Sequence, residues 1–403
     1  MTILGAAAAT RGGPDSTFGK DDMDLDFTAE QEMLRETVRG ICDKHAPLSV
    51  VREMEDHPVG YPESFWTQLA DLGLLGLTIS EQHGGSGMTM LDAVVVYEEL
   101  GRALAPSPHF VSSVLSGGVI ERAGSDEQCA QWLPRIAAGS AVLTPAWLEP
   151  AGGFGPRGVQ LRAENDGDQV VLTGAKRHVR FARSADTFVV LARTGPSDTD
   201  IDLFLVDRDA PGISLTQQMT IASDTQYHVD FDSVRVPASA RVGQSGTAWT
   251  AWNATMRDGI VLLAAYAMGG AQYALDITVQ YAKDRHQFDK PLGAFQALAH
   301  YLADGKCTVD GGRALVWEAA WCDQGRAADR LAPMAKLFAC QTFRDVTAIA
   351  QQIFGGVGFT VEYDIQLYFR RAKALQIDWW DSRYLEELVA AAVLDDGGET
   401  GEG

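Results

Sequence analysis

The chain has few cysteines and none of the spacings that bind metals. Its 403 residues include five cysteines, which stand far apart at Cys42, Cys129, Cys307, Cys322 and Cys340. No CxxC pair and no HxxxH pair occurs. Zinc sites and disulfide frameworks have characteristic ligand or cysteine spacings, so we predict reduced thiols and no metal site.

Positive charge is also scarce. The 33 Lys and Arg residues stand against 54 Asp and Glu residues, which gives a net charge of −21 and a pI near 4.7. A nucleic-acid-binding protein needs a basic face, so this balance excludes a nucleic-acid partner. An anionic ligand would need a local basic lining.

Long apolar runs are missing as well. No run reaches the ~18 residues of a membrane span. The segment Met1–Thr10 is rich in Ala but lacks the basic start and long apolar stretch of a signal peptide. We therefore predict no membrane association and a cytoplasmic location. With 46% hydrophobic residues, the chain is long enough for two or three domains with their own cores.

Periodicity divides the chain into three parts between two tails. Residues 1–24 are rich in Gly, Ala and Asp, and residues 395–403 are acidic and Gly-rich, so both are predicted to be disordered. Residues 25–140 show helical periods, beginning with a capping box of Thr28 and Gln31. The first predicted apolar helix face consists of Met33, Leu34, Val38 and Ile41.

Residues 141–245 have the pattern of a β domain. Short β-rich runs are bounded by Gly, Asp and Pro turns, at Gln169–Thr173, Thr187–Arg193 and Ile201–Asp207.

Helical periods return over residues 246–394. Four helices are predicted, at Ile260–Lys283, Pro291–Cys322, Pro333–Phe354 and around Tyr384–Leu394. Pro333 is expected in a first helical turn, where its missing N–H costs nothing. Short connections favour an antiparallel four-helix bundle. The predicted fold class is α+β, with an all-helical domain, a middle β domain and a four-helix bundle.

Two segments of this last part carry a family resemblance. They are Tyr281–Gln296 (YAKDRHQFDKPLGAFQ) and Gln352–Gly358 (QIFGGVG). At their spacing they resemble the FAD-binding elements of the acyl-CoA dehydrogenase family, in which each subunit helps to hold its neighbour's flavin. The order of helical, β and bundle domains is also similar to that family. No GxGxxG loop follows a strand, so a Rossmann fold is not expected.

The resemblance implies a cofactor, FAD, and a set of residues for its adenosine-pyrophosphate half. An Arg fork suits a pyrophosphate, side-chain amides suit polar edges, and glycines allow close backbone approach. The implied cofactor-binding residues are Arg285, Gln287, Phe288, Gln296, Gln352, Gly355 and Gly356.

The segments that hold the flavin ring in the family are altered here. The family's Thr-Glu-Pro-x-x-Gly-Ser stretch begins with Leu148 and ends with Phe154 in this chain. In the Lys-x-Trp-Ile-Thr/Ser stretch, His178 replaces the aromatic plate and Arg180 the hydroxyl donor. We favour His178 and Arg180 as exposed strand residues on a face that binds nothing, over a re-tuned flavin site.

The family's catalytic glutamate is missing from both of its usual positions. The first position holds Trp379, followed by Trp380 in place of glycine, and the second holds Gly259. No catalytic residue is therefore assigned. Nearby carboxylates are Asp258, Asp378 and Asp381. Asp378 and Asp381 are the fallback bases, but we favour solvated or capping roles for all three.

The resemblance implies α,β-dehydrogenation of an acyl-CoA thioester, in which a carboxylate takes the α-proton and the flavin accepts the β-hydride. Our first hypothesis is a base-lacking subunit in a heterotetramer, which completes the FAD site of a paralogous subunit. Such a complex would act in lipid or steroid catabolism and pass electrons to an electron-transfer flavoprotein or a similar acceptor. The alternatives are a self-sufficient flavoenzyme with an Asp base or monooxygenase chemistry, and a non-enzymatic scaffold.

Overall fold

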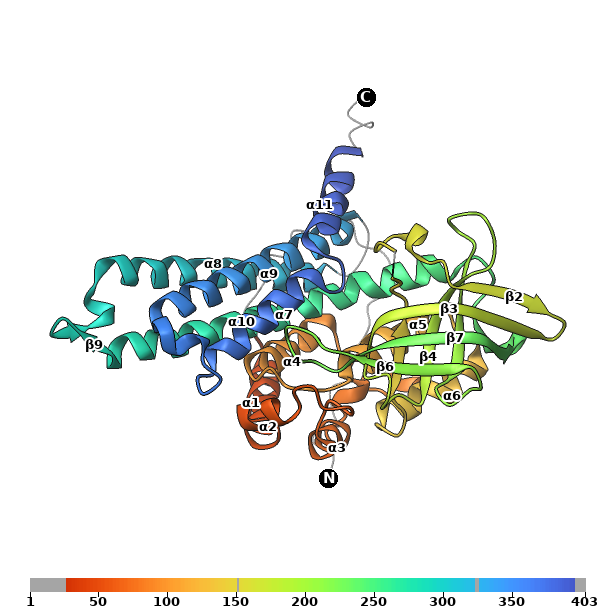
Figure 1. Cartoon of the computed structure of the whole chain (residues 1–403), viewed down its shortest axis with the longest axis horizontal. Coiled ribbons are helices and arrows are strands. Elements are labelled where there is room, and N and C mark those ends of the chain that lie inside the picture. Colours follow the sequence, from red (N-terminus) through yellow and green to blue (C-terminus); the bar gives the residue numbers. More distant parts are fainter. Residues whose placement is uncertain (1–26, 151, 323–325, 396–403) are drawn as a thin grey trace.

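The computed structural model describes residues 27–150, 152–322 and 326–395 (Figure 1). The tail predicted at 1–24, and residues 396–403 of the C-terminal tail, lie outside the described residues. Within the described part, the predicted order of a helical domain, a β domain and a helical bundle is confirmed.

The N-terminal domain is helical. Its α-helices are α1 Ala29–His45, α2 Leu48–Glu53, α3 Glu63–Asp71, α4 Met90–Arg102, α5 Gly118–Ala123 and α6 Asp126–Ala137, and a π-helix spans Phe110–Gly117. The Thr28 capping box is confirmed. Val38 and Ile41 are buried as predicted, but Met33 is 60% exposed. The prediction for Met33 was wrong because five residues at ~100° each turn it well away from Val38.

The middle domain is a mostly antiparallel sheet. Its strands are β1 Leu143–Ala146, β2 Arg162–Asp166, β3 Gln169–Arg180, β4 Thr187–Arg193, β5 Ile201–Asp207, β6 Ile213–Gln218, β7 Gln226–Pro237 and β8 Arg241–Val242. They lie in the order β6-β7-β3-β2-β4-β5-β8, and β1 pairs in parallel with β4. The predicted strands are present, although β3 continues to Arg180. A register shift between Lys176 and Val179 bulges this extension.

The C-terminal part is a bundle of long helices, one more than predicted. Its helices are α7 Ala248–Asp284, α8 Gln296–Trp321, α9 Arg326–Phe354, α10 Ile365–Ile377 and α11 Ser382–Ala390. The bundle consists of α7 to α10, and α10 was missed by the sequence prediction. Pro333 lies inside α9 rather than in its first turn. The extra turns form because Leu331 and Ala332 are buried against the core.

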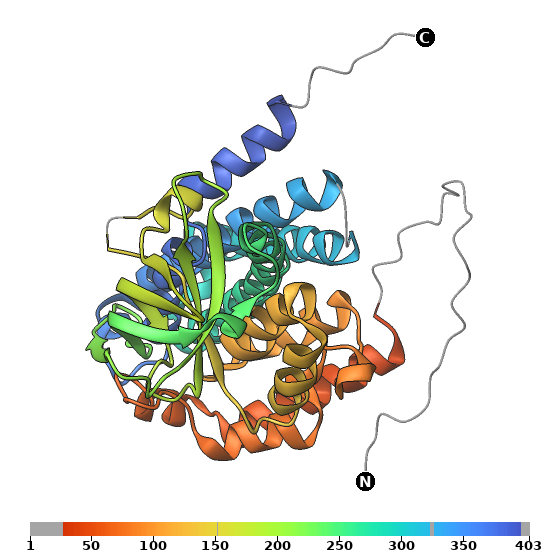
Figure 2. The same ribbon diagram turned by 90° about the vertical axis from the view of Figure 1, so that its right-hand side faces the viewer.

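Helix α7 joins the two ends of the molecule. In Figure 1 it runs from beside the sheet to the hairpin labelled β9 (His286–Gln287), and Figure 2 shows the N-terminal helices to one side of the sheet. By length and composition α7 is apolar enough to cross a membrane, but 72% of its most apolar window is buried inside the protein. It is the core helix of the bundle.

Candidate functional site

The two segments that resemble FAD-binding elements meet at the far end of the bundle. The rings of Tyr281, near the end of α7, and Phe354, at the end of α9, stack with centroids 4.2 Å apart and planes 16° apart. This contact places the loop after α7 beside the glycines after α9, although about 70 residues of sequence separate them.

The loop after α7 is a small hairpin of β9 His286–Gln287 and β10 Lys290–Pro291. Phe288 and Asp289 form its tip with φ of 54° and 61°, a conformation that glycine usually supplies. The Phe288 side chain is 87% exposed. Arg285 precedes the hairpin, is exposed, and forms no ion pair with any described residue. The loop therefore presents a cation and an aromatic ring that its own chain leaves available.

The glycines after α9 leave their backbone accessible. Gly355 has a φ of 66°, and a Cβ added at Gly355 or Gly356 would meet no atom within 4 Å. Gln352 and Gln296, the remaining two predicted residues, are also exposed. The structure thus brings all seven predicted cofactor residues to the surface of one end of the bundle.

A cluster of aromatic rings lies at the other candidate site, where the family's base is missing. Trp379 is 5% exposed, and its indole stacks on Trp147 with centroids 6.0 Å apart and planes 12° apart. Trp147 also contacts Trp252 and Phe154, at centroid distances of 5.4 and 5.9 Å. Phe110 meets the edge of Trp379 at 5.1 Å. We call these five residues the aromatic plug.

The backbone around Trp379 is hydrogen-bonded to a buried lysine, Lys336. Trp379 and Trp380 have φ of 53° and 73°, the left-handed region that non-glycine residues rarely adopt. Lys336 is fully buried, and its Nζ donates to the carbonyls of Leu375, Asp378 and Trp380 at 3.2, 2.9 and 2.9 Å. These three bonds hold the strained turn, since they satisfy carbonyls that the end of α10 leaves unpaired.

The second position for a base is closed by packing. Gly259 is buried in α7, and a Cβ there would lie 3.0 Å from a Leu115 methyl group and 3.3 Å from the Phe110 ring. A glutamate cannot fit without moving both. The adjacent Asp258 is paired with Arg122 instead.

The two fallback carboxylates are committed to other partners. Asp381 caps α11 by accepting a hydrogen bond of 2.9 Å from the Tyr384 amide. Asp378 is ion-paired with Arg180, which also pairs with Asp224 at 2.5 Å. Burial raises the pKa of Asp378 despite the opposing charge of Arg180. For Asp224 burial alone would raise the pKa, but the guanidinium groups of Arg180 and Arg371 lower it to about 2.

The residues that correspond to the flavin-ring stretches have different surroundings. Lys176 is fully buried and pairs with Glu149 at 2.7 Å, and burial lowers the pKa of Lys176 to about 8. His178 is exposed at the bulge of β3, as expected. Arg180 differs from the expectation of an exposed strand residue. Its side chain is only 17% exposed, because the two carboxylates draw it inward.

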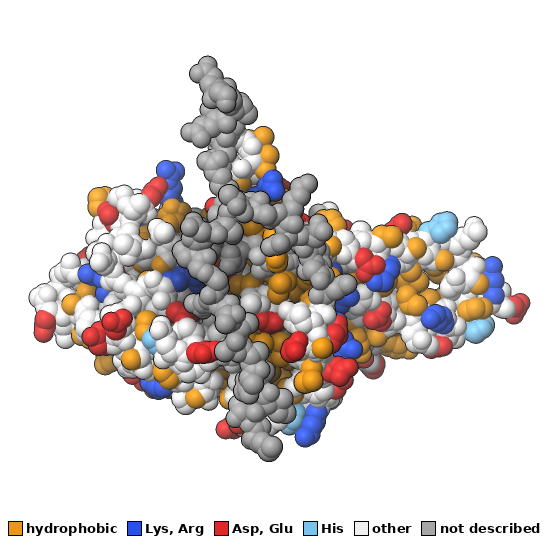
Figure 3. Space-filling model, turned by 180° about the vertical axis from the view of Figure 1, so that it is seen from behind, with side chains coloured by type: hydrophobic (Ala, Val, Ile, Leu, Met, Phe, Trp, Pro, Cys, Tyr) orange, Lys and Arg blue, Asp and Glu red, His pale blue; other side chains and the backbone are white. Residues whose placement is uncertain are grey.

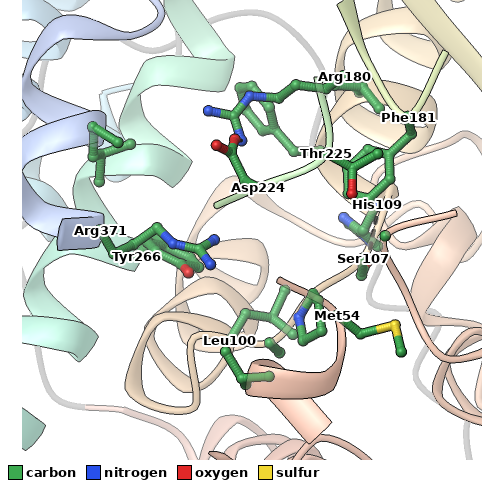
Figure 4. A pocket seen from close by; sticks show the side chains of 18 of the residues that line it. Met54, Leu100, Ser107, His109, Arg180, Phe181, Asp224, Thr225, Tyr266 and Arg371 are labelled. Carbon is green, nitrogen blue, oxygen red and sulfur yellow. Dashed lines mark hydrogen bonds and ion pairs between the residues drawn. The ribbon is translucent and has the colours of Figure 1, made fainter. Parts of the chain in front are cut away.

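A pocket that sequence reasoning did not anticipate opens beside Arg180, between the sheet, α4, α7 and α10 (Figure 4). It encloses about 910 Å³ of non-atom space, including open solvent at its mouth. Its polar lining includes Arg180, Asp224, Tyr266 and Arg371, and Trp379 forms part of its wall. The adjacent pair Arg370-Arg371, in a helix that packs in the bundle, was the signal that could have drawn attention to it.

Comparison with known proteins agrees with this architecture. Residues 28–140, 145–234 and 246–393 match the family models for the N-terminal, middle and C-terminal domains of acyl-CoA dehydrogenase. "Probable acyl-CoA dehydrogenase YngJ" of Bacillus subtilis is 31% identical over 92% of this chain and 100% of its own length. The chain belongs to the acyl-CoA dehydrogenase family.

Solved structures of other family members superpose closely. A chain of the ChsE4-ChsE5 complex from Mycobacterium tuberculosis has a TM-score of 0.84 and 28% identity, with 94% of this chain and 100% of that chain covered. A chain of the Tcur3481-Tcur3483 steroid ACAD has a TM-score of 0.81 and 31% identity, with coverage of 91% and 98%. Acyl-CoA dehydrogenases generally use FAD and dehydrogenate acyl-CoA thioesters.

The two candidate sites differ in how well they fit this cofactor. At the far end of the bundle, the unpaired Arg285 and the open backbone of Gly355 and Gly356 fit the polar half of a dinucleotide. Beside Trp379, the aromatic plug packs against the altered ring-binding stretches, and the space that stays open is the pocket beside Arg180. In this acyl-CoA dehydrogenase family member, the groups exposed at the bundle end suit a dinucleotide, whereas the groups that hold the flavin ring in the family are replaced beside Trp379.

Proposed function

We propose that this chain is a non-catalytic subunit of a hetero-oligomeric acyl-CoA dehydrogenase. It completes the FAD site of a paralogous subunit and performs no proton abstraction itself. The observation that carries the proposal is the aromatic plug, in which Trp379 stacks on Trp147 at the position of the base. The closed packing around Gly259 supports it, since the other position cannot hold a base either.

In this proposal the chain's own residues bind and orient. Arg285 pairs with the pyrophosphate, Gln287, Gln296 and Gln352 hydrogen-bond to the nucleotide, and Phe288 covers it. The bound FAD supplies the acceptor for the substrate's β-hydride. The partner supplies the carboxylate for the α-proton, and the acyl-CoA thioester binds on the partner's side. An electron-transfer flavoprotein or similar acceptor then reoxidises the complex, which we place in the cytoplasm.

An exposed apolar surface supports assembly with a partner. Large apolar side chains on the bundle are exposed by 39% to 87%, at Phe288, Tyr301, Trp321, Phe338 and Phe359. Figure 3 shows hydrophobic side chains spread along the bundle half of one face. Exposed apolar surface of this kind marks subunit contacts. The ChsE4-ChsE5 complex, whose title names two different subunits, is a precedent for a mixed assembly. The steroid named for the Tcur3481-Tcur3483 protein suggests lipid or steroid catabolism.

The alternatives have less support. An Asp base would have to come from Asp378 or Asp381, and both are engaged, one by Arg180 and the other by the N-terminus of α11. A flavin monooxygenase would still have to hold a flavin ring beside the aromatic plug, where His178 and Arg180 replace the groups that hold it in the family. A pure scaffold would not need Arg285 free of ion pairs at the surface.

Measuring bound flavin tests the proposal. The chain is purified alone and co-expressed with a paralogous subunit that keeps the glutamate. We expect almost no FAD and no dye-reducing dehydrogenase activity for the chain alone, and one FAD per heterodimer in the complex. A yellow homo-oligomer with one FAD per chain and ordinary turnover would contradict the proposal.

A further inference from the structure

The pocket beside Arg180 is separate from the bundle end that we assign to FAD, and it contains polar groups that the fold itself does not use. We propose that it binds a small carboxylate with a compact apolar body, held by Arg371 with help from Tyr266. This inference does not depend on the chain's role as a partner subunit.

Most of the polar side chains that line the pocket are already satisfied. Asp224 pairs with Arg180 and accepts hydrogen bonds from Thr220 and Gln226. Both ring nitrogens of His109 are engaged, by the Tyr97 hydroxyl at 2.8 Å and the Leu74 carbonyl at 3.0 Å. Groups bonded in this way have little to offer a ligand.

Further lining groups are used in the same manner. Glu55 is ion-paired with Arg370, which also donates to the Ser223 hydroxyl at 3.3 Å. The Thr225 hydroxyl donates to the His57 carbonyl at 2.8 Å. These bonds link the α2–α3 connection, the loop before β7 and α10 around the pocket.

Arg371 is different. It lines the pocket from α10 and forms no ion pair with any described carboxylate, whereas its neighbour Arg370 does. In Figure 4 its guanidinium extends from α10 toward the middle of the pocket. Asp224 and Asp378 are ion-paired with Arg180, whereas Arg371 lowers the pKa of Asp224 without forming an ion pair with it, so its guanidinium can still meet a ligand.

Tyr266 supplies a second unused group next to Arg371. Its hydroxyl is buried and makes no hydrogen bond of good geometry in the described structure, although the Arg371 guanidinium lies close enough to lower its pKa against the effect of burial. Figure 4 shows Tyr266 and Arg371 side by side. A carboxylate has two oxygens, so it can accept from the guanidinium fork and from an adjacent hydroxyl at once. A buried hydroxyl without a partner is uncommon in folded proteins and indicates a missing ligand or water.

The rest of the lining is apolar and fits a compact body rather than a CoA thioester. Leu100, Leu263, Leu375, Phe110 and Trp379 contribute to the wall. Ligand pockets commonly have this composition, with apolar walls and a few convergent polar groups. The aromatic plug adjoins this wall through Phe110 and Trp379, so the ligand lies beside the plug and not in place of it.

Paired probes that differ only in charge test the proposal. The full-length chain is titrated with hexanoate and with hexanamide, followed by calorimetry and thermal shift. We expect hexanoate to bind and to raise the Tm, and hexanamide to bind at least about tenfold more weakly, because a charge-assisted pair is lost. 4-Phenylbutyrate and its amide repeat the comparison with an aromatic body.

Three variants assign the effect to residues. Arg371→Gln should weaken hexanoate binding about tenfold or more, and Tyr266→Phe should weaken it less. Lys373→Gln removes a positive charge from the same helix outside the pocket and should bind like the wild type. Arg371→Lys, which keeps the charge without the fork, serves if the Gln variant does not fold.

Three outcomes would overturn the proposal. They are equal binding of hexanoate and hexanamide, unchanged hexanoate binding by Arg371→Gln, and no binding of either carboxylate at about 10 mM, well above a millimolar Kd.

Discussion

The indole of Trp379 lies almost parallel to that of Trp147, with centroids 6.0 Å apart. This stack joins the end of α10 to the loop after β1 at the place where the family carries a catalytic carboxylate. A packed aromatic contact therefore occupies the position from which the family's catalytic carboxylate would take a proton from the substrate. The site is closed by several residues together, and not by the loss of one side chain.

Restoring a carboxylate alone should leave the chain inactive. In Trp379→Glu the new side chain still faces Trp147, Phe154 and the paired Arg180, and catalysis requires reacting groups in near-attack geometry. For the isolated variant chain, we expect acyl-CoA-dependent dye reduction to stay at the background rate. Substantial turnover by the single variant would show that the flavin pocket is intact and our account of the plug wrong.

Removing the exposed guanidinium at the bundle end should weaken flavin binding. In the complex, Arg285→Ala loses charge-assisted hydrogen bonds of roughly 1.5–3 kcal/mol, so the Kd for FAD should rise about tenfold or more. Saturating FAD should return most of the rate, because the partner's base is unchanged. The measurement is a flavin titration of the reconstituted complex.

Trp379→Ala is the matched control for that titration. Its ring is buried in the aromatic plug, so its loss should destabilise the fold by about 3–5 kcal/mol without changing the Kd for FAD. Identical FAD affinity in wild type and Arg285→Ala would remove the role of this chain in the partner's site.

Lys336 should be one of the most sensitive polar positions. Lys336→Met leaves the carbonyls of Asp378 and Trp380 buried without their donor, at a cost of about 1–3 kcal/mol for each unsatisfied group. We expect a clearly lower midpoint in urea unfolding. Lys306→Met is the control, because that lysine forms an exposed helix pair with Asp310 and should change stability by less than about 1 kcal/mol. Equal midpoints for the two variants would refute the role of Lys336.

Asp224 should make stability depend on pH under acidic conditions. Its pKa falls from 3.8 in the unfolded chain to about 2 in the folded protein. The stabilisation is therefore fully present above about pH 4 and is lost as the pH falls toward 2, by roughly 2 kcal/mol in total. Asp378 has the opposite sign, since its raised pKa favours the folded state as the pH falls.

Because the charge of Asp224 raises the pKa of Asp378, the comparison is made in an Asp378→Asn background, with and without Asp224→Asn. The difference in unfolding free energy between the two proteins should shrink as the pH falls from about 5 to about 2.5. This range runs from above the unfolded pKa of Asp224 to near its folded pKa. A constant difference for Asp224→Asn would contradict the ion pair with Arg180.

Much of the fold was predictable because it depends on short-range patterns. The Thr28 capping box needs only residues three apart, and the runs at Thr187–Arg193 and Ile201–Asp207 are strands with the predicted bounds. Helix α10 also had a signal that was overlooked. Its buried residues Ile365, Tyr368, Ala372 and Leu375 follow a helical period.

The sequence by itself determined the family resemblance, the domain order and the absence of a glutamate at Trp379 and Gly259. Only the tertiary structure decided what those absences leave behind. Lys336 reaches carbonyls about 40 residues later in the chain. Arg371 lines a pocket with Tyr266 and Asp224, which come from two other elements. Side chains so far apart in sequence meet only when the helices and the sheet pack. Their ion pairs, and the polar groups that remain without a partner, are therefore set by the tertiary structure.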